Sequence, residues 1–277
     1  MGGGHRVHVG GVGHGALPGT IRLRIARPRP GASPHRPERG FLRARFRARS
    51  ARDPCKERPA HDPPPAPQAS VATPAGGAAL TAPSALKNRG PIADLLAHAD
   101  PPGGRALEIA SGTGEHVVHF AARLPGLDWQ PSDIDPARRA SIDAHARTAG
   151  LPNIRAAVDL DAARPGWGAE WAGQSLVLVV NLLHLIPQDA ADTVLAEAAA
   201  ALSPGGRLVV YGPFRRAGEL TSDGDRAFDA ALRESDPAIG YKDDFDTLDR
   251  MLDAGLEIRD VIEMPANNLG LVAWRPP

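Results

Sequence analysis

One ten-residue stretch constrains the fold of this chain more than any other. Residues 107–116 read LEIASGTGEH, so a short apolar run meets a turn with Gly112 and Gly114 and then the start of a helix. Glycine lets the backbone turn sharply and approach a ligand where any Cβ would collide, and the first amides of the next helix then point outward. The stretch predicts a strand, a turn and a helix that cradle a nucleoside-type ligand. A strand-to-helix turn in any parallel α/β protein can also need glycine for its geometry alone.

The residues around this turn narrow the type of ligand. A dinucleotide-binding turn has a third small residue where this chain has Val117, which disfavours NAD. Glu108 lies inside the apolar run, where a charge needs a partner such as a cofactor amine or loop amides. Asp133 follows Gly114 by 19 residues, close to the ~20-residue spacing at which a carboxylate receives ribose hydroxyls. Alone, Asp133 fits a capping or loop role equally well; together with Glu108 and the glycines it favours ribose binding.

The first 82 residues differ from the rest in composition. Residues 1–62 contain 14 Lys and Arg against four Asp and Glu, whereas residues 63–277 contain 18 against 28, so the net charge of zero is a cancellation. The segment is rich in Arg, Pro and Gly and has no apolar periodicity, so we expect residues 1–82 to be a disordered leader and linker. A plain tail, or upstream sequence from a misassigned start codon, explains it best. The alternative is a basic arm that binds nucleic acid or an anionic surface.

Cysteine usage and hydropathy bear on the setting of the chain. The single cysteine, Cys55, has no partner for an intramolecular disulfide or a thiolate metal cluster. The sequence contains neither a secretory apolar segment nor a run long enough to span a membrane. We therefore expect a cytoplasmic protein with no metal and no membrane partner.

Residues 83–277 alternate short apolar runs with amphipathic segments, which is typical of a three-layer α/β domain with a doubly wound, mostly parallel sheet of seven strands. The expected strands are at residues 106–109, 127–130, 154–158, 176–180, 207–211, 256–263 and 269–274. The expected helices are at residues 84–99, 115–124, 136–149, 189–202, 222–234 and 244–254. Because the last two strands are separated by a loop too short for a helical crossover, they should pair antiparallel.

With these elements placed, residues 83–275 resemble class I S-adenosylmethionine-dependent methyltransferases, and more closely the methyltransferase-like protein 26 family. Besides LEIASGTGEH, the resemblance rests on WQPSD at 129–133, NLLH at 181–184, YGPF at 211–214, FD at 228–229 and PANN at 265–268. The stretch KNRGPI at 87–92 is similar to the entry motif of the family, Arg-Asn-Lys-x-Pro-Ile, although Lys87 replaces the arginine.

The resemblance implies S-adenosylmethionine as the cofactor and a set of residues that bind it. That set is Asn88, Glu108, Ser111, Gly112, Gly114, Asp133, Asp161 and Asn181. Asp161 would face the adenine amine, with Asp159 as the alternative because neighbouring residues on a strand face opposite sides. Asn181 ends the fourth expected strand, where ligands bind in open α/β sheets.

The expected chemistry is methyl transfer from a sulfonium, which needs alignment of the reactants and no metal. For an alcohol or amine acceptor, His184 is the first choice of general base, and packing at a strand end is its alternative role. Tyr211 would supply a hydroxyl, and Asn181 completes the catalytic set. We therefore predict a methyltransferase with an unidentified, preferably small-molecule acceptor. A non-catalytic sensor or scaffold that binds S-adenosylmethionine is the alternative, and nucleic acid stays open as a partner.

The remaining motif residues are expected to be structural. Phe228 should pack in the core with Asp229 capping or paired outside. Asn267 and Asn268 should form a turn, because asparagine tolerates left-handed backbone angles, and a lid over a pocket is their alternative role.

Overall fold

The computed structural model describes residues 20–21 and 72–277. The expectations of a disordered leader and of a basic arm fall almost entirely on residues outside this described part. In the described residues no helix is long and apolar enough to cross a membrane.

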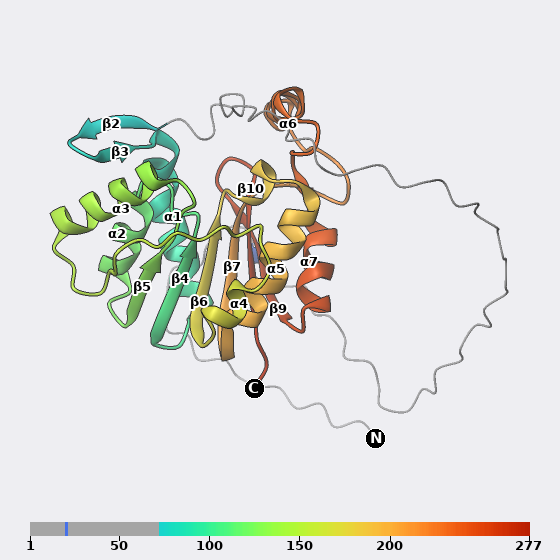
Figure 1. Ribbon diagram of the computed structural model, residues 1–277. Coiled ribbons are helices and arrows are strands. Elements are labelled where there is room, and N and C mark those ends of the chain that lie inside the picture. The colour runs from blue at the N-terminus through green and yellow to red at the C-terminus, as the bar shows by residue number, and fades with distance from the viewer. Residues whose placement is uncertain (1–19, 22–71) are drawn as a thin grey trace, which may run out of the picture. The chain divides into compact units, whose positions relative to one another are not determined.

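The centre of the molecule is one mixed sheet (Figure 1). Its strands run in the order β1-β9-β10-β7-β6-β4-β5, and the two-residue strand β8 pairs with β7 outside this path. Strands β5, β4, β6 and β7 are parallel neighbours, whereas β10 is antiparallel to both β7 and β9. The predicted α/β class with an antiparallel final strand is confirmed, but the sheet has eight strands where we expected seven. The strands are β1 (Thr20–Ile21), β4 (Gly104–Ile109), β5 (Leu127–Pro131), β6 (Gln174–Val180), β7 (Leu202–Arg215), β8 (Lys242–Asp243), β9 (Glu257–Met264) and β10 (Asn268–Trp274).

Helices cover both faces of this sheet and complete the three layers (Figure 1). On β6, Leu176, Leu178 and Val180 face the core beneath α1, α2 and α3, while Val177 and Val179 face the core beneath α4, α5 and α7. A strand buried on both faces reads as a continuous apolar run, which is why β6 was predictable. The helices are α1 (Pro83–Ala99), α2 (Glu115–Arg123), α3 (Pro136–Ala149), α4 (Trp167–Glu170), α5 (Gln188–Ala201), α6 (Asp223–Ser235) and α7 (Asp244–Asp253).

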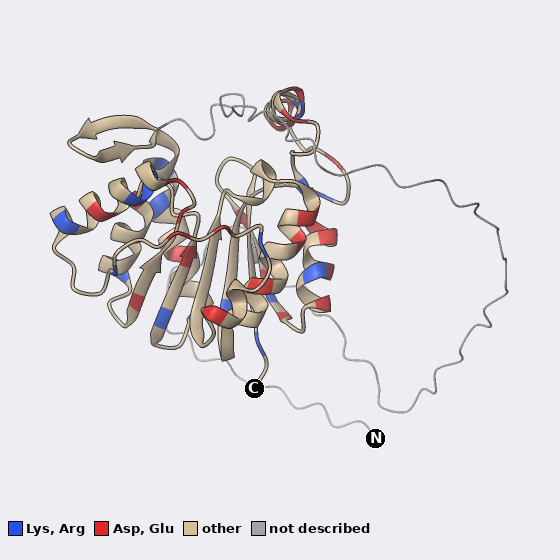
Figure 2. Cartoon of the chain, viewed as in Figure 1, with Lys and Arg blue, Asp and Glu red and all other residues tan. Residues whose placement is uncertain are grey.

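The six predicted helices are all present, and α4 and the short 3₁₀ helix η2 (Leu183–Leu185) are additional. Charged residues lie mainly on the helices and loops, while β6 carries none (Figure 2). Helix α6 packs through a small cluster of its own, in which Leu232 contacts Ile239 and Tyr241.

The strand expected at residues 154–158 is wrong. Only two isolated parallel bridges form there, Trp129 with Ile154 and Ser132 with Val158. Pro131 lies between the two bridged residues Trp129 and Ser132, and a proline has no N–H to donate to a neighbouring strand. Its carbonyl accepts from the Val158 amide at 3.1 Å, so the ladder skips a residue and does not continue as a strand.

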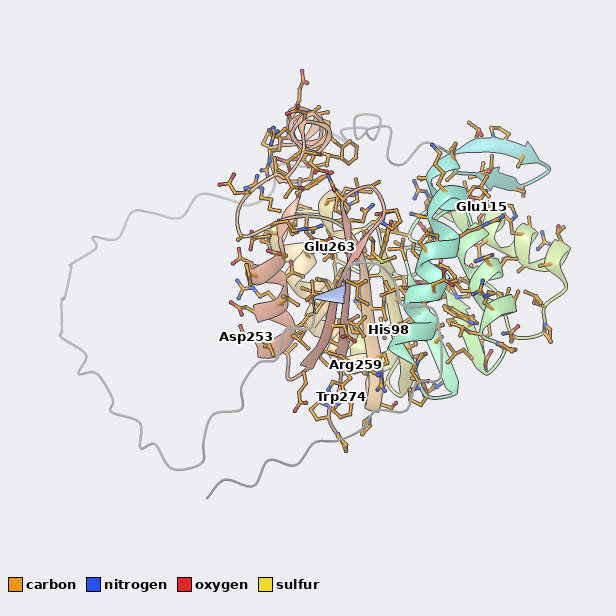
Figure 3. All side chains as sticks on the ribbon, turned by 180° about the vertical axis from the view of Figure 1, so that it is seen from behind. His98, Glu115, Asp253, Arg259, Glu263 and Trp274 are labelled. Atoms are coloured by element: carbon orange, nitrogen blue, oxygen red, sulfur yellow. The ribbon has the colours of Figure 1, made fainter. Side chains whose placement is uncertain are left out.

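A β-hairpin that the sequence did not predict lies within residues assigned to the linker. Its strands are β2 (Thr73–Gly76) and β3 (Ala79–Thr81). The amide of Leu80 donates to Ser141 Oγ at 2.8 Å, which ties the hairpin to α3. Glu115, labelled beside the hairpin in Figure 3, accepts from the Thr81 hydroxyl and from the Ala82 amide. These bonds fix the hairpin over the start of α2.

Candidate functional site

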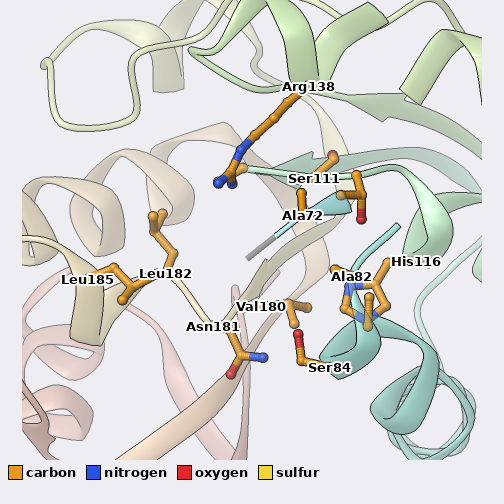
Figure 4. A pocket seen from close by; sticks show the side chains of 14 residues that line it. Ala72, Ala82, Ser84, Ser111, His116, Arg138, Val180, Asn181, Leu182 and Leu185 are labelled. Atoms are coloured by element: carbon orange, nitrogen blue, oxygen red, sulfur yellow. The ribbon is translucent and has the colours of Figure 1, made fainter. Parts of the chain in front are cut away.

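Two adjoining cavities open beyond the carboxyl ends of the parallel strands. The first, which we call the glycine-turn cavity, holds about 110 Å³ and is lined by residues 110–113, by residues that follow β6 and by Ala72 and Ala82 beside the hairpin (Figure 4). The second, the aromatic cavity, holds about 290 Å³ and lies among α1, the end of β6, α6 and the β9–β10 loop. Ser84 and Asn181 line both. Ligands in the two cavities would therefore meet at these residues.

The two glycines of the turn have different roles. Gly112 has φ +63°, and a Cβ built on it meets no atom within 4 Å, so its missing side chain leaves open space in the glycine-turn cavity. Gly114 has φ +97°, and a Cβ there would lie 2.6 Å from the Cα of Ile142. Gly114 is therefore required for the close approach of α3 and lies outside the cavity lining, although the sequence placed both glycines in the cradle.

Asp133 supports the turn from behind. Its two carboxylate oxygens accept from the amides of Gly112 and Asp135, each at 3.0 Å. The residue is 3% exposed, and burial raises the pKa of its carboxyl despite these bonds. It does not belong to the cavity lining, so the predicted ribose contact stays a prediction.

Glu108 is a buried carboxyl with little hydrogen bonding. It is the last but one residue of β4, is 1% exposed and lines neither cavity, and neither carboxylate oxygen has a hydrogen bond of normal geometry among the described residues. Burial is the main reason that its pKa rises to about 8. The neighbouring Ser111 side chain opposes the rise in part, and the nearby charge of Asp133 adds to it. An uncompensated buried acid of this kind marks functional sites, because a structural role would normally come with hydrogen bonds.

The Ser111 hydroxyl already has hydrogen-bond partners within the protein. It donates to the Glu108 carbonyl at 3.3 Å and accepts from the Ser132 amide at 3.2 Å, while the residue lines the glycine-turn cavity. Arg138, which the sequence did not single out, extends over the same cavity (Figure 4).

His184 lies in the wall of the aromatic cavity, 3% exposed, beside two other rings. Its centroid is 5.9 Å from that of Phe228 and 6.2 Å from that of Tyr241. Burial first, and the charge of Lys242 second, lower its pKa to about 4. The ring is therefore neutral at pH 7. It packs in the wall and lines the cavity, and its role as a general base stays a prediction.

Asn88 connects the two cavities. Its Oδ1 lies 2.7 Å from Nε2 of His116, which lines the glycine-turn cavity, while Asn88 itself lines the aromatic cavity. Asn88 also bonds to the Tyr211 hydroxyl, and burial raises the pKa of Tyr211 to about 12. Burial lowers the pKa of His116 to about 4. All three side chains are neutral at pH 7.

The other sequence expectations are placed as follows. Asp161 accepts from the Ala163 amide at 3.1 Å and pairs with Arg164, and Asp159 pairs with Arg139. Neither aspartate lines the glycine-turn or the aromatic cavity. Asn267 has φ +57°, as expected for a turn. Phe228, which we expected in the core, packs partly buried against the cluster of Leu232, Ile239 and Tyr241. It also lines the aromatic cavity together with Tyr241, which sequence analysis did not single out.

Comparison with known proteins places the chain in a family. The family model described as "Protein of unknown function (DUF938)" matches residues 79–275. The chain belongs to the DUF938 family. The match includes both cavities except for Ala72.

Solved structures similar to the DUF938 chain have the same fold at low sequence identity. An O-methyltransferase family protein from Burkholderia thailandensis is 16% identical with a TM-score of 0.60, covering 70% of this chain and 57% of its own. Mitomycin 7-O-methyltransferase is 17% identical with a TM-score of 0.59, and the match covers 71% of this chain and 55% of that enzyme. Human N-acetylserotonin methyltransferase, solved in complex with SAM, is 14% identical with a TM-score of 0.57. The match covers 70% of this chain and 53% of that enzyme. The DUF938 chain thus spans a little over half the length of these proteins, and the likeness establishes the fold.

Proposed function

We propose that this chain binds S-adenosylmethionine in the glycine-turn cavity and methylates an acceptor bound in the aromatic cavity. The observation that carries the proposal is the junction of the two cavities at Ser84 and Asn181. A transfer between two ligands needs such a junction, because the reacting atoms must be aligned about 3–3.5 Å apart. The junction lies at the carboxyl ends of parallel strands, where doubly wound sheets bind their ligands. The methyltransferase fold supports the same assignment.

The residues in and behind the glycine-turn cavity fit an adenosyl ligand that carries both a sulfonium and a carboxylate. The lining includes Arg138, which would face the carboxylate, and among the described residues it contains no Asp or Glu. Gly112 leaves room for the ligand, and Ser111 and Asn181 face the same space. Behind the turn, Glu108 offers a buried carboxyl that a cationic group would compensate, with Asp133 holding the Gly112 amide in place. When bound, S-adenosylmethionine supplies an electrophilic methyl group whose sulfur leaves as a neutral thioether.

The neutral groups of the aromatic cavity suit the acceptor side. The His184 ring is neutral at pH 7, so its unprotonated ring nitrogen can take a proton from an acceptor as the oxygen or nitrogen of that acceptor reacts. Tyr211 keeps its proton and donates a hydrogen bond, and Asn88 holds that hydroxyl in position. Asn181 separates the two sides and orients the reactants.

The finer parts of the proposal are the kinship with methyltransferase-like protein 26 and a small-molecule acceptor. The kinship rests on the sequence motifs, several of which meet at these cavities: Asn88, Gly112, Asn181, Tyr211 and Asn268. The acceptor size rests on a cavity of about 290 Å³, which is near the lower limit of roughly 300 Å³ for small-molecule sites.

Calorimetry tests the cofactor half of the proposal. Wild-type protein should bind S-adenosylmethionine and S-adenosylhomocysteine, and Asp133→Ala should bind both more weakly by about 1–3 kcal/mol, because the Gly112 amide loses its acceptor. Asp128→Ala is the matched control, since Asp128 lies on β5, the strand that leads to Asp133, but forms an exposed pair with Arg155. A wild-type protein that binds neither compound would contradict the proposal. Equal binding by Asp133→Ala would remove that residue from the site.

A further inference from the structure

Aromatic rings from distant segments form one wall of the aromatic cavity. His184 follows β6, Phe228 lies in α6 and Tyr241 precedes β8, with the last two rings 6.1 Å apart and steeply inclined at 66°. The Tyr241 hydroxyl donates to Asp225 Oδ1 at 3.2 Å, which fixes the ring. Inclined rings present edges and faces to the cavity, and another aromatic ring is the ligand that packs best against them.

The charges around the aromatic cavity disfavour a cation. Its lining contains Lys87 but no Asp or Glu among the described residues. Behind His184 lies the buried ammonium of Lys242, which donates to the carbonyls of Ile186 and Gly240 at 2.7 and 3.2 Å. The two carboxylates beside Tyr241 already have partners. Asp225 accepts four side-chain hydrogen bonds, and Asp229 accepts from the Tyr241 amide and pairs with two arginines, Arg215 and Arg233. A sulfonium in the neighbouring cavity would add a further positive charge.

We infer that the acceptor is a flat aromatic compound bearing a hydroxyl group, neutral or carrying an anionic substituent. This inference rests on the proposed methyl transfer and names its substrate class. The ring would lie against Phe228, Tyr241 and His184, with the hydroxyl toward Tyr211 and Asn181 and an anionic substituent toward Lys87 at the exposed rim.

The proposed reaction accounts for each bond and for the proton with groups present at the site. The phenolic oxygen forms a bond to the methyl carbon, the carbon–sulfur bond breaks with its electron pair remaining on sulfur, and the phenolic proton passes to the His184 ring. A phenol loses its proton near pH 10, as tyrosine does. A weakly basic, buried imidazole such as His184 therefore suits a phenol better than an aliphatic alcohol, whose proton is far harder to remove.

Three probes of similar size test the inference: 2-naphthol, decahydro-2-naphthol and 2-(aminomethyl)naphthalene. Each is titrated by calorimetry into protein saturated with S-adenosylhomocysteine. We expect 2-naphthol to bind at least about tenfold more tightly than the saturated alcohol and the amine. Phe228→Ala should abolish this preference, whereas Phe245→Ala, a half-exposed phenylalanine on α7, should retain it. With S-adenosylmethionine, mass spectrometry should detect 2-methoxynaphthalene.

Several results would overturn the inference. These are equal binding of the two alcohols, tighter binding of the amine, or no binding of 2-naphthol to a protein that does bind S-adenosylhomocysteine. In each of these cases the proposed cofactor site stands. Failure to bind S-adenosylhomocysteine itself is the separate result that contradicts the proposed function.

Discussion

Replacing Glu108 with glutamine should abolish the pH dependence of S-adenosylmethionine binding. In the ligand-free protein burial raises the Glu108 pKa to about 8, so the carboxyl is protonated at pH 7. A cationic ligand favours the ionised form, and binding to wild type should therefore release a proton. Affinity should rise with pH by up to about tenfold per unit between pH 6 and 8 and then level off. Calorimetry in buffers of different ionisation enthalpy measures the released proton directly.

The control for this measurement is Glu197→Gln, because Glu197 is hydrogen-bonded to the Gly168 amide and lines neither cavity. It should release a proton on binding as wild type does. Proton release that persists in Glu108→Gln would assign the titration to another group.

The raised pKa of Glu108 also predicts how the stability of the ligand-free protein changes with pH. The folded pKa of about 8 lies above the ordinary value of 4.5. The contribution of Glu108 to the free energy of unfolding is therefore complete below pH 4.5. It is lost as the pH rises to 8, at about 1.4 kcal/mol per pH unit. Relative to wild type, Glu108→Gln should become more stable as pH is raised from 5 to 8. Urea denaturation of both proteins at the two pH values measures the difference, and a constant difference would refute the raised pKa.

The sheet was predictable because its signals are local. The run of apolar residues in β6 and the glycine turn after β4 depend on a few consecutive residues, and both have the expected structure. The missing strand at 154–158 depends on Pro131 in a different strand, which sequence periodicity around residue 156 does not reveal. The edge of a sheet is determined by its neighbour as much as by its own residues.

The residues of the candidate site were predictable only where they lie within a single continuous sequence motif. The residues of the turn and Asn181 were found because each directly follows a recognisable strand. The aromatic wall was missed because Phe228 and Tyr241 come together only through the packing of α6 on the segment before β8. The spacing of Asp133 from the turn did not reveal that its oxygens hold the backbone of the turn, and the ribose contact that the spacing indicates stays a prediction.

The two glycines of the turn should separate stability from cofactor binding. A methyl group on Gly114 would meet the Ile142 backbone at 2.6 Å, in a backbone conformation with φ +97° that alanine rarely adopts. Overpacking costs about 1–3 kcal/mol and a left-handed conformation about 1–2 kcal/mol, so Gly114→Ala should lose about 2–5 kcal/mol of unfolding free energy. Gly112→Ala meets no atom and should lose about 1 kcal/mol, the cost of its φ of +63° alone.

Cofactor affinity should follow the opposite order. The methyl group of Gly112→Ala would occupy space in the glycine-turn cavity, so S-adenosylmethionine should bind at least about tenfold more weakly, a loss of about 1.4 kcal/mol. Gly114→Ala, assayed at a temperature where it is folded, should retain more of its affinity because its added methyl group points at α3. Urea denaturation and calorimetry on both variants measure the two quantities. If Gly112→Ala binds the cofactor as tightly as wild type, the open space beside the turn is not where the ligand lies, and the glycine serves the backbone turn alone.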